Sequence, residues 1–475
     1  MGRAGTSQRG YQKMAYIAAE ISRYFILIFF AIYTFYCFRA FARKTEQGKE
    51  KVFRRQRVLI LMIVTICNVV LLMENRDLKY VFLYAFQLIF FVGFTKIYQI
   101  FYKGLSKLIL NNMMMCMMIG FIMLERLKYD YAMRQMIMAA AAMGICLLVP
   151  LFIERFSIWE KLRWQYALVG ILFLLLVFVI GQERYGAVNW ISIGGISLQP
   201  SEFVKIIYVF FVSASLTKIT TPSKAAKLTF REQFKKIVII SGVAAIHVVI
   251  LVVERDLGAA LIYFVAYLFI LYAATMQVVY LAAGFGGGVV ASVVAYHLFS
   301  HVRTRVVAWK DPWNHIDNEA YQVCRSLFAI GTGGLFGMGL GQGMPESVPV
   351  VESDFIIAAI TEEMGLLFTI CLILVYLSSY IMFVNIAMKM KKRFYKLTAF
   401  GLSIVFIFQT FLCIGGATKF IPSTGVTLPL ISYGGSSIIT TIIIFSIIQG
   451  MYVMNGREEE VNSYEEQKKS SGRRK

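Results

Sequence analysis

Long runs of apolar residues, separated by short polar segments, follow one another along almost the whole chain. Each run has roughly 17–25 residues, the length of an α-helix that spans a bilayer, and most runs are apolar around the whole helix. Thirteen runs are predicted to be membrane helices, near residues 22–40, 57–74, 79–98, 108–124, 135–153, 163–181, 202–219, 236–253, 257–274, 277–299, 355–388, 397–416 and 435–454. The run 355–388 is too long for one perpendicular helix, so we expect it to tilt or to extend past the membrane. The predicted fold is an all-α polytopic membrane protein.

The positive charge of the chain lies mainly in alternate polar segments. Its net charge is +21, although only 16% of its residues are charged. Lys and Arg concentrate in residues 39–57, 218–236, 389–396 and the tail from 457. The positive-inside rule places such segments in the cytoplasm, so that 182–201, 300–353 and 417–434 face outward. This placement argues against nucleic acid as a partner and predicts an external N-terminus with a cytoplasmic C-terminus.

The cysteines and histidines predict neither a disulfide framework nor a metal cage. Six of the seven cysteines lie inside apolar runs, as small core side chains do, and Cys324 stands alone in an external segment. The four histidines form no HExxH pattern. No cofactor is therefore expected from these residues.

Polar residues and loop lengths divide the chain into three regions. Residues 1–105 hold three apolar runs with little polarity inside them, and we name this region the N-terminal extension. Residues 106–455 hold ten runs and every unusual loop, which predicts a ten-helix core. Residues 456–475 are charged and nearly free of apolar side chains, so they are predicted to be a disordered cytoplasmic tail.

The first unusual external segment is 181–205, GQERYGAVNWISIGGISLQPSEFVK. Ser201 is a good N-cap for the following helix, and Glu202 then falls in its first turn. Lys205 lies about one turn into that helix, where its charge opposes the positive end of the helix dipole and calls for an anionic partner. Three interpretations stay open: Glu202 pairs with Lys205 locally, Lys205 reaches the membrane surface, or a carboxylate on another helix pairs with it.

The second segment, 300–354, is longer than the ~15 residues that structureless loops usually reach, which is typical of functional loops. It contains Arg303, Arg305 and seven glycines between 331 and 343. It ends in Asp354, at the start of an apolar run. A carboxylate placed there is unfavourable unless it is paired or used, although aspartate is also a common helix N-cap.

Two further features complete the polar set. Glu362 and Glu363 lie two turns beyond Asp354, inside the apolar run, and are functional candidates unless a cation on another helix pairs with them. The third external segment is 421–437, IPSTGVTLPLISYGGSS. Its prolines and glycines break the backbone just outside the last apolar run, which is tolerated only where protein or a cavity covers it.

Together these segments resemble the SEDS family (shape, elongation, division and sporulation), the FtsW/RodA/SpoVE-type proteins of bacteria, over roughly residues 108–455. The matching motifs are WISIGGISLQPSEFVK, RDLGAA, AYQVCRSLFAIGTGGLFGMGLGQG, VPVVESDFIIAAITEEMG and PSTGVTLPLISYGGSS. The resemblance implies a peptidoglycan glycosyltransferase in the bacterial cytoplasmic membrane. Such a hexosyltransferase polymerises lipid II, an undecaprenyl-pyrophosphate-linked donor, at the outer face, for division, elongation or sporulation. It also implies a class B penicillin-binding protein as the cross-linking partner, with other divisome or elongasome membrane proteins.

The resemblance assigns roles to individual residues. It makes Asp354 the catalytic residue and Lys205 its ion-pair partner. Further substrate-binding residues are expected to be Glu202, Trp190, Arg303, Arg305, Glu352, Ser432, Gly434 and Gly435. Arg303 and Arg305 are candidates to stabilise the charge on the leaving pyrophosphate. The only cofactor considered is a divalent cation, Mg²⁺ or Mn²⁺.

The chain also departs from the family pattern. Asn189 stands where the family often has arginine, Arg255 stands where it has proline in QPDLG, and His315 falls where aspartate is common. Two other functions stay open: a flippase or transporter for lipid II, and a non-catalytic scaffold for a transpeptidase with Asp354 as a plain helix cap. The clustering of polar residues on the outside favours the enzyme, because a flippase needs a polar path open to both sides.

Overall fold

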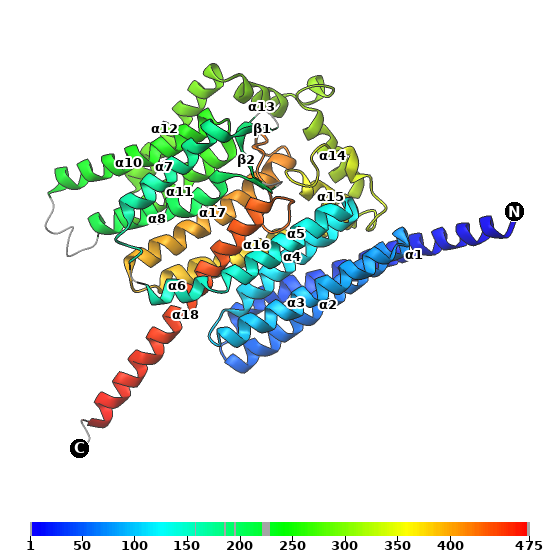
Figure 1. Ribbon diagram of the computed structural model, residues 1–475, viewed down its shortest axis with the longest axis horizontal. Coiled ribbons are helices and arrows are strands. Elements are labelled where there is room, and N and C mark those ends of the chain that lie inside the picture. The colour runs from blue at the N-terminus through cyan, green and yellow to red at the C-terminus, as the bar shows by residue number, and fades with distance from the viewer. Residues whose placement is uncertain (1, 157, 185–186, 194–195, 221–228, 473–475) are drawn as a thin grey trace.

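The helices of the protein run side by side in one elongated bundle, with the chain termini at opposite ends (Figure 1). The computed structural model describes residues 2–156, 158–184, 187–193, 196–220 and 229–472. Within these residues, 13 helices are long and apolar enough to cross a membrane. This agrees with the thirteen predicted runs.

The elements follow the predicted order. The N-terminal extension forms α1 (Gly2–Ala42), α2 (Glu46–Asn75) and α3 (Leu78–Phe101). The membrane helices of the core are α4 (Lys107–Leu127), α5 (Tyr129–Cys146) with its short continuation α6 (Val149–Arg155), α7 (Arg163–Ile180), α8 (Pro200–Thr220), α10 (Phe230–Val253), α11 (Leu257–Thr275), α12 (Val278–Leu298), α16 (Leu366–Lys389), α17 (Arg393–Ala417) and α18 (Gly435–Gly472). The second external segment adds α13 (Ser300–Lys310), η1 (Trp313–His315), α14 (Tyr321–Gly333), η2 (Pro345–Ser347) and α15 (Ile356–Met364).

A small antiparallel sheet, absent from the all-α prediction, follows α7. Its strands are β1 (Gln182–Arg184), β2 (Ala187–Ile193) and β3 (Ile196–Leu198). β2 is central and pairs Ile191 with Leu198. Alternating polar and β-branched residues in WISI favour such a strand, but the segment is too short to stand out among long apolar helices.

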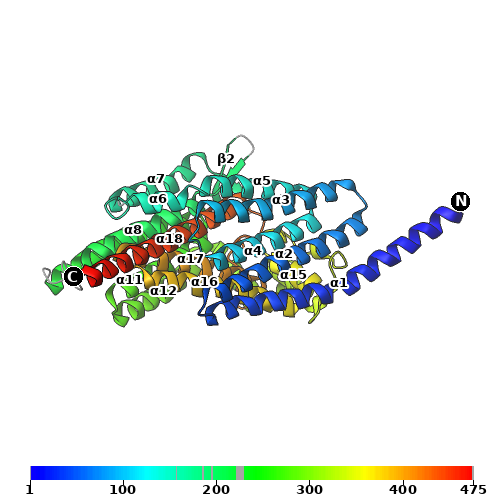
Figure 2. The same cartoon turned by 90° about the horizontal axis from the view of Figure 1, so that it is seen from below.

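Burial identifies α4 as the centre of the bundle and α12 as its periphery. The apolar part of α4 is 100% buried, whereas that of α12 is 0% buried. Figure 2 shows α2 and α3 beside α4, so the extension covers a side of α4 that would otherwise face lipid.

The extension is joined to the core by polar contacts at membrane depth. The Tyr33 hydroxyl donates to Asn112 Oδ1 at 2.9 Å, and Gln87 Nε2 donates to Glu125 Oε2 at 2.7 Å. Further contacts join Asn111 to Gln56, Asn68 to Gln87, and Asn112 to Ser378 and Ser379. The expectation of little polarity in the extension was therefore wrong. Buried hydrogen bonds of this kind specify how membrane helices associate.

Two element boundaries differ from the prediction. The run 355–388 is not one tilted helix, because the chain breaks at Gly365 between α15 and α16. Gly365 has φ +90°, and a Cβ there would lie 2.5 Å from the backbone nitrogen of Gly337. Only glycine fits this close approach.

The C-terminal region is also more regular than predicted. α18 continues as a helix to Gly472 and projects beyond the bundle (Figure 1), where residues 456–475 were expected to be disordered. Residues 457–471 contain neither glycine nor proline and are rich in Glu, Gln and Lys. These residues have high helix propensity, so charge alone did not prevent a helix here.

Candidate active site

The three external segments of the core meet at one end of the bundle, near the β-strands, α13 and α14 (Figure 1). The side chains of interest come from the start of α8, the start of α11, α13, the turn before α15 and residues 421–435. These segments are far apart in sequence, and the helices that carry them pack together.

Asp354 lies in the turn that precedes α15 and does not cap this helix. The N-cap position belongs to Phe355, and no side chain caps α15. The Asp354 carboxylate is partly exposed and accepts one protein hydrogen bond within the described residues, from the Ser353 hydroxyl to Oδ1 at 2.9 Å. The structure therefore contradicts the helix-cap interpretation, and Oδ2 stays available to a ligand.

The side chain of Arg305 lies close to that of Asp354. Its Nη1 donates to the Ser423 carbonyl at 2.7 Å. Gly425 separates the two side chains: a Cβ at this position would lie 3.5 Å from Asp354 Oδ2 and 3.6 Å from Arg305 Nη2. Gly425 also has φ +73°, which favours glycine. The backbone turn at Gly425 thus leaves room for both charged groups on one side of it.

The electrostatics of this space raise the pKa of Asp354 above its ordinary value. Burial is the main cause, because it disfavours the charged carboxylate. The Ser353 hydrogen bond and the Arg305 charge oppose this rise in pKa, while Glu352 and Asp256 add to it. A carboxyl group with a raised pKa is a better proton acceptor when it is ionised.

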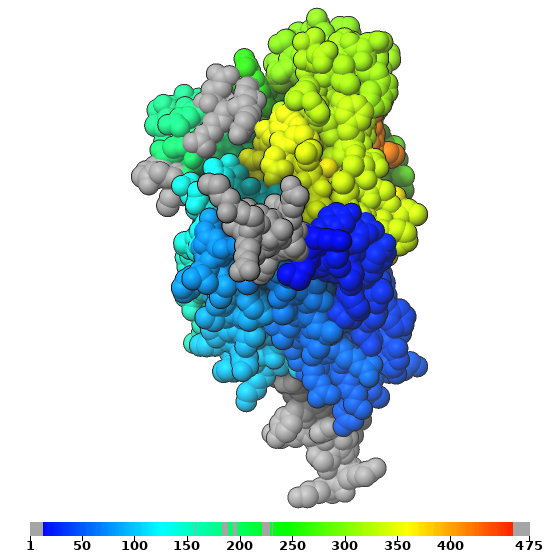
Figure 3. Space-filling view, turned by 90° about the vertical axis from the view of Figure 1, so that its right-hand side faces the viewer, coloured from blue at the N-terminus to red at the C-terminus, as the bar shows by residue number. Residues whose placement is uncertain are grey.

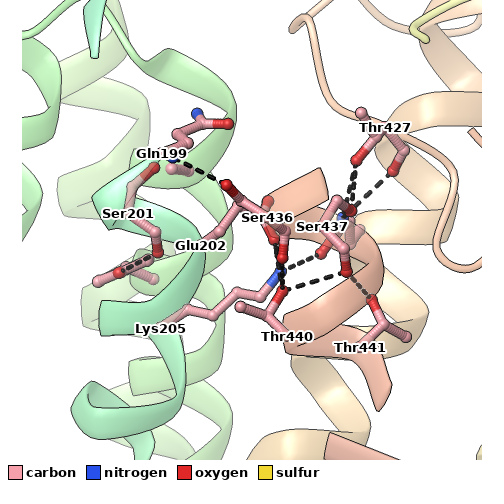
Figure 4. A network of polar contacts seen from close by, with 12 residues as sticks. Gln199, Ser201, Glu202, Lys205, Thr427, Ser436, Ser437, Thr440 and Thr441 are labelled. Carbon is pink, nitrogen blue, oxygen red and sulfur yellow. Dashed lines mark hydrogen bonds and ion pairs between the residues drawn. The ribbon is translucent and has the colours of Figure 1, made fainter. Parts of the chain in front are cut away.

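Lys205 has other partners. Its Nζ donates to Glu202 Oε2 at 2.5 Å (Figure 4). It also donates to Gln409 Oε1 at 2.8 Å. Among the described residues, no ion pair joins Lys205 to Asp354. The predicted ion pair is therefore corrected to the local pair, which the sequence had left open. Residues three apart lie on one helix face, so Glu202 reaches Lys205 without help from another helix.

The Lys205 pair is nevertheless connected to the loop beside Asp354. Gln409 on α17 donates through Nε2 to the Thr427 carbonyl at 3.2 Å, and Thr440 on α18 donates to Glu202 at 2.9 Å. One turn after Gln409, Cys413 Sγ contacts the Asp354 carbonyl oxygen at 3.6 Å. Lys205 and Asp354 thus lie on two sides of the same loop, and α17 contacts both.

Asp256 is a site residue that the sequence-based selection missed. It caps α11 through Ala259 N, and its Oδ2 accepts from Asn189, Gln199 and Ser201 at 2.9–3.1 Å. It gathers the first external segment around the start of α11, and its charge acts on both Asp354 and Arg305. The available signal was its N-cap position before an apolar helix.

Comparison with known proteins identifies the family. A family profile described as "Cell cycle protein", of the FtsW/RodA/SpoVE type, matches residues 105–455. The chain belongs to the FtsW/RodA/SpoVE family. The peptidoglycan glycosyltransferase RodA of Mycobacterium tuberculosis is 33% identical over 347 residues, which are 70% of this chain and 74% of that protein. The probable peptidoglycan glycosyltransferase FtsW of Aliivibrio salmonicida is 31% identical over 325 residues, 67% of this chain and 79% of that protein.

Solved structures show the same fold. A chain from a peptidoglycan synthase complex that coordinates polymerization and crosslinking has a TM-score of 0.60 and 22% identity. The rod shape determining protein RodA of Thermus thermophilus has a TM-score of 0.51 and 21% identity. This chain covers 97% and 96% of these two chains, whereas 73% of its own length is matched.

Two departures from the family motifs lie beside Asp256. Asn189, where the family often has arginine, donates to Asp256 at 3.1 Å. The predicted substrate-binding residue Trp190 follows it in β2 and is half-buried; successive strand residues point to opposite faces. Arg255 has φ +63°, which proline cannot adopt. The ERDLG turn of this chain therefore differs in backbone from a turn built on the family's usual QPDLG.

Two more of the predicted substrate-binding residues, Arg303 and Glu352, differ in their distance from Asp354. Arg303 is exposed and donates to the His297 carbonyl at 3.3 Å, so it does not join Arg305. Residues two apart on a helix such as α13 do not face each other. Glu352 lies near Asp354, since its charge acts on that carboxyl group.

Ser432, Gly434 and Gly435 hold the loop that follows Gly425. The Ser432 hydroxyl contacts the Ser353 carbonyl and accepts from Leu428 N at 2.8 Å. Gly434 N donates to Gln135 Oε1 at 3.3 Å, and a Cβ on Gly435 would lie 2.6 Å from Met138 Sδ. In this structure their contacts position the loop.

Two further titratable groups near the site were also missed. Glu254 is 1% exposed, and both its carboxyl oxygens lack a hydrogen-bond partner within the described residues. Burial, and then the Asp256 charge, raises the pKa of Glu254 to about 8. Burial, followed by the Arg255 and Arg305 charges, lowers the pKa of His301.

The glycine-rich segment is hydrogen-bonded to the end of α15. Met338 N and Gly339 N donate to the carbonyls of Glu362 and Glu363 at 2.9 Å. The carboxylate of Glu363 accepts from Gly341 N at 3.1 Å. Glu363 is thereby tied to the segment by backbone and side chain alike.

Arg126 on α4 also binds Glu363 and the glycine-rich segment. Arg126 donates to Glu363 at 2.9 Å, to Glu346 at 2.7 Å and to the Gly343 carbonyl at 3.1 Å. Of the two interpretations of Glu363, the structure supports the one in which a cation on another helix pairs with it.

The N-terminal extension reaches the same glycine-rich segment. Arg23 on α1 donates to the Gly337 carbonyl at 2.7 Å, and the Tyr24 ring lies 5.9 Å from that of Phe336. Figure 3 shows α1, in dark blue, directly beside the yellow loop of the core. The extension thus contacts the segment that is hydrogen-bonded to the last residues of α15.

Proposed function

We infer that this protein is a peptidoglycan glycosyltransferase, a membrane enzyme that polymerises lipid II into glycan strands. One observation supports this most directly. A partly exposed carboxylate, Asp354, retains a free oxygen next to Arg305 at the end of the bundle where the external loops meet. The curated relatives that carry this activity in their names match about 70% of the chain.

In the proposed reaction, Asp354 is the general base. It accepts the proton of the acceptor sugar's 4-hydroxyl as that oxygen forms a bond to the anomeric carbon of the donor. The bond from this carbon to the polyprenyl pyrophosphate breaks, and the pyrophosphate leaves with the electron pair. General-base catalysis typically contributes about 10²–10⁴ in rate.

Arg305 would stabilise the charge that develops on the pyrophosphate. It is the arginine that lies beside Asp354, whereas the side chain of Arg303 contacts the end of α12. A preorganised cation in a site that excludes water stabilises such charge strongly. Among the described residues, no three His, Cys, Asp or Glu side chains form a group that could hold a metal ion.

The Lys205–Glu202 pair would act through the loop. Its partners Gln409 and Thr440 connect α8 to α17 and α18, and Gln409 holds the loop residue Thr427. We therefore propose Lys205 as a positioning residue. It would hold the loop that contains Thr427 and Gly425, and this loop borders the Asp354 carboxylate.

We propose further that the enzyme lies in the bacterial cytoplasmic membrane with the site on its outer side. The charge pattern of the loops supports this orientation. A class B penicillin-binding protein is the proposed partner for cross-linking. The likeness to a chain of a synthase complex that coordinates polymerization and crosslinking supports this pairing.

Glycan synthesis by the purified protein tests the function. With lipid II in detergent, the wild-type protein should produce polymer, and Asp354→Asn should not. Asp311→Asn is the matched control, because Asp311 lies in the same external segment and binds Asn314 locally. Polymer formation by Asp354→Asn at the wild-type rate would refute the assignment. Absence of polymer from every form, with or without a penicillin-binding protein, would favour the scaffold or flippase alternatives.

A further inference from the structure

A cavity lies between the inner ends of α7, α8 and α10, at the opposite end of α8 from the candidate active site (Figure 1). Its volume is about 340 Å³. Three cations line it, one from each helix: Arg163, Lys218 and Lys236. Trp164 lines it as well. The cavity therefore combines positive charge with an aromatic side chain where the loops are predicted to be cytoplasmic.

These cations have no direct carboxylate partner within the described residues. Among the described residues, none of the three forms an ion pair. Glu232, on the same helix as Lys236, interacts with Lys236 electrostatically but forms no ion pair with it, and its Oε2 accepts two hydrogen bonds from Thr229, at 2.8 and 3.0 Å. Arg163 stacks 5.1 Å from the Trp164 ring centre.

The position of Arg163 strengthens the demand for an anion. It is the first residue of α7, whose N-terminus has neither a side-chain cap nor an acidic residue in its first turn. The positive end of the helix dipole and the guanidinium charge therefore add instead of cancelling. An anion in the cavity would be stabilised by both.

The apolar part of the lining indicates what carries the anion. Ile219, Ile239 and Ile240 form the rest of the wall, and Ile239 is 49% exposed. Isoleucines beside cations match a molecule with a charged head and a hydrocarbon chain. Basic pockets between membrane helices on the cytoplasmic side bind the headgroups of anionic lipids.

We propose that this cavity binds an anionic phospholipid of the inner leaflet. Its phosphate would lie among Arg163, Lys218 and Lys236, and an acyl chain would lie along the isoleucines. The lipid would join the inner ends of three helices, including α8, whose outer end carries Glu202 and Lys205. This site is separate from the proposed catalytic one, so its test does not depend on the proposed function.

Native mass spectrometry of the full-length protein in neutral detergent provides the test. The probes are phosphatidylglycerol, phosphatidylcholine as the neutral lipid, and glycerol 1-phosphate as a soluble phosphate. We expect phosphatidylglycerol adducts on the wild type. In the triple variant Arg163→Gln, Lys218→Gln and Lys236→Gln, binding should weaken on the order of 100-fold, because each cation near an anionic headgroup contributes roughly fivefold.

Two further variants separate the cavity from charge in general. Arg39→Gln with Arg43→Gln and Lys44→Gln removes three cations from the inner end of α1 and the turn that follows it, and this α1 variant should retain the lipid. Ile239→Trp keeps every charge but fills the cavity, so it should lose the lipid; it decides the question if the triple variant does not fold. Equal binding of phosphatidylcholine, equal loss in the α1 variant, or competition by glycerol 1-phosphate at the lipid's own concentration would each overturn the proposal.

Discussion

The two ends of the short helix α15 carry carboxylates that the protein treats in opposite ways. Asp354, before its first turn, is partly exposed and accepts one hydrogen bond among the described residues. Glu363, near its last residue, has a 0% exposed side chain and accepts from both Arg126 and Gly341. Both are acids beside a membrane helix, yet only Asp354 keeps an oxygen for a substrate.

The difference shows how to interpret a carboxylate at membrane depth. Such groups are functional candidates by default, but a carboxylate that accepts a protein hydrogen bond on each oxygen has less acceptor capacity left for a substrate. Spare acceptor capacity, with a cation such as Arg305 close by and not bonded to it, distinguishes Asp354. Glu363 instead fastens the glycine-rich segment.

The largest expected effect comes from neutralising each acid in turn. Asp354→Asn should lower polymerisation by about 10²–10⁴-fold and leave thermal unfolding nearly unchanged. Glu363→Gln should do the reverse: it removes the buried partner of Arg126, which keeps the exposed Glu346 and the Gly343 carbonyl, and it lowers the free energy of unfolding by about 3–5 kcal/mol. Lipid II polymerisation per folded molecule and unfolding in detergent measure the two effects. If both variants lost activity and stability to a similar extent, Asp354 and Glu363 would not have different roles.

The second prediction tests whether the ion pair of Lys205 and Glu202, next to the site, stabilises the fold. Lys205→Met leaves the half-buried Glu202 without its cation, so unfolding should become easier by about 3–5 kcal/mol. Adding Glu202→Gln removes the stranded charge and should restore most of this stability. A double-mutant cycle measured by thermal unfolding gives the coupling between the residues. A coupling near zero would contradict the pair.

A smaller effect is expected on the pH dependence of catalysis. Arg305 lowers the pKa of Asp354 against the upward effect of burial, so Arg305→Gln should raise that pKa further. A base works when it is ionised, and the acid limb of kcat/KM should therefore move to higher pH. The pH profile of polymerisation measures this movement. An unchanged acid limb, or one moved to lower pH, would mean that Arg305 does not act on Asp354.

The smallest expected effect concerns Glu254, which lacks partners. Its pKa is raised to about 8 in the folded protein, so ionisation of the unfolded chain destabilises the fold increasingly as pH rises from about 5 to 8. Glu254→Gln should raise the melting temperature by a few degrees, more at pH 8 than at pH 6. Melting curves at the two pH values measure this, and a pH-independent change would contradict the assignment.

Patterns along the chain predicted the parts of the structure that depend on local composition. The apolar runs predicted the thirteen helices, and the loop motifs singled out Asp354 and Arg305. Tertiary contacts decided the rest. Gly365 breaks a continuous apolar run because Gly337 packs against it, and no local pattern shows that contact. The partner of Lys205 was undetermined for the same reason, since both a local acid and a distant one satisfied its charge.

The hydrogen bonds between the extension and α4 have a consequence for any shortened form of this chain. Asn112 Oδ1 and Glu125 Oε2 each accept a hydrogen bond from residues 1–105, and lipid would offer no donor in its place. A core cut free at residue 106 would present bare amide and carboxyl groups to hydrocarbon. We therefore expect the core truncated at residue 106 to unfold more easily in the membrane than the full chain.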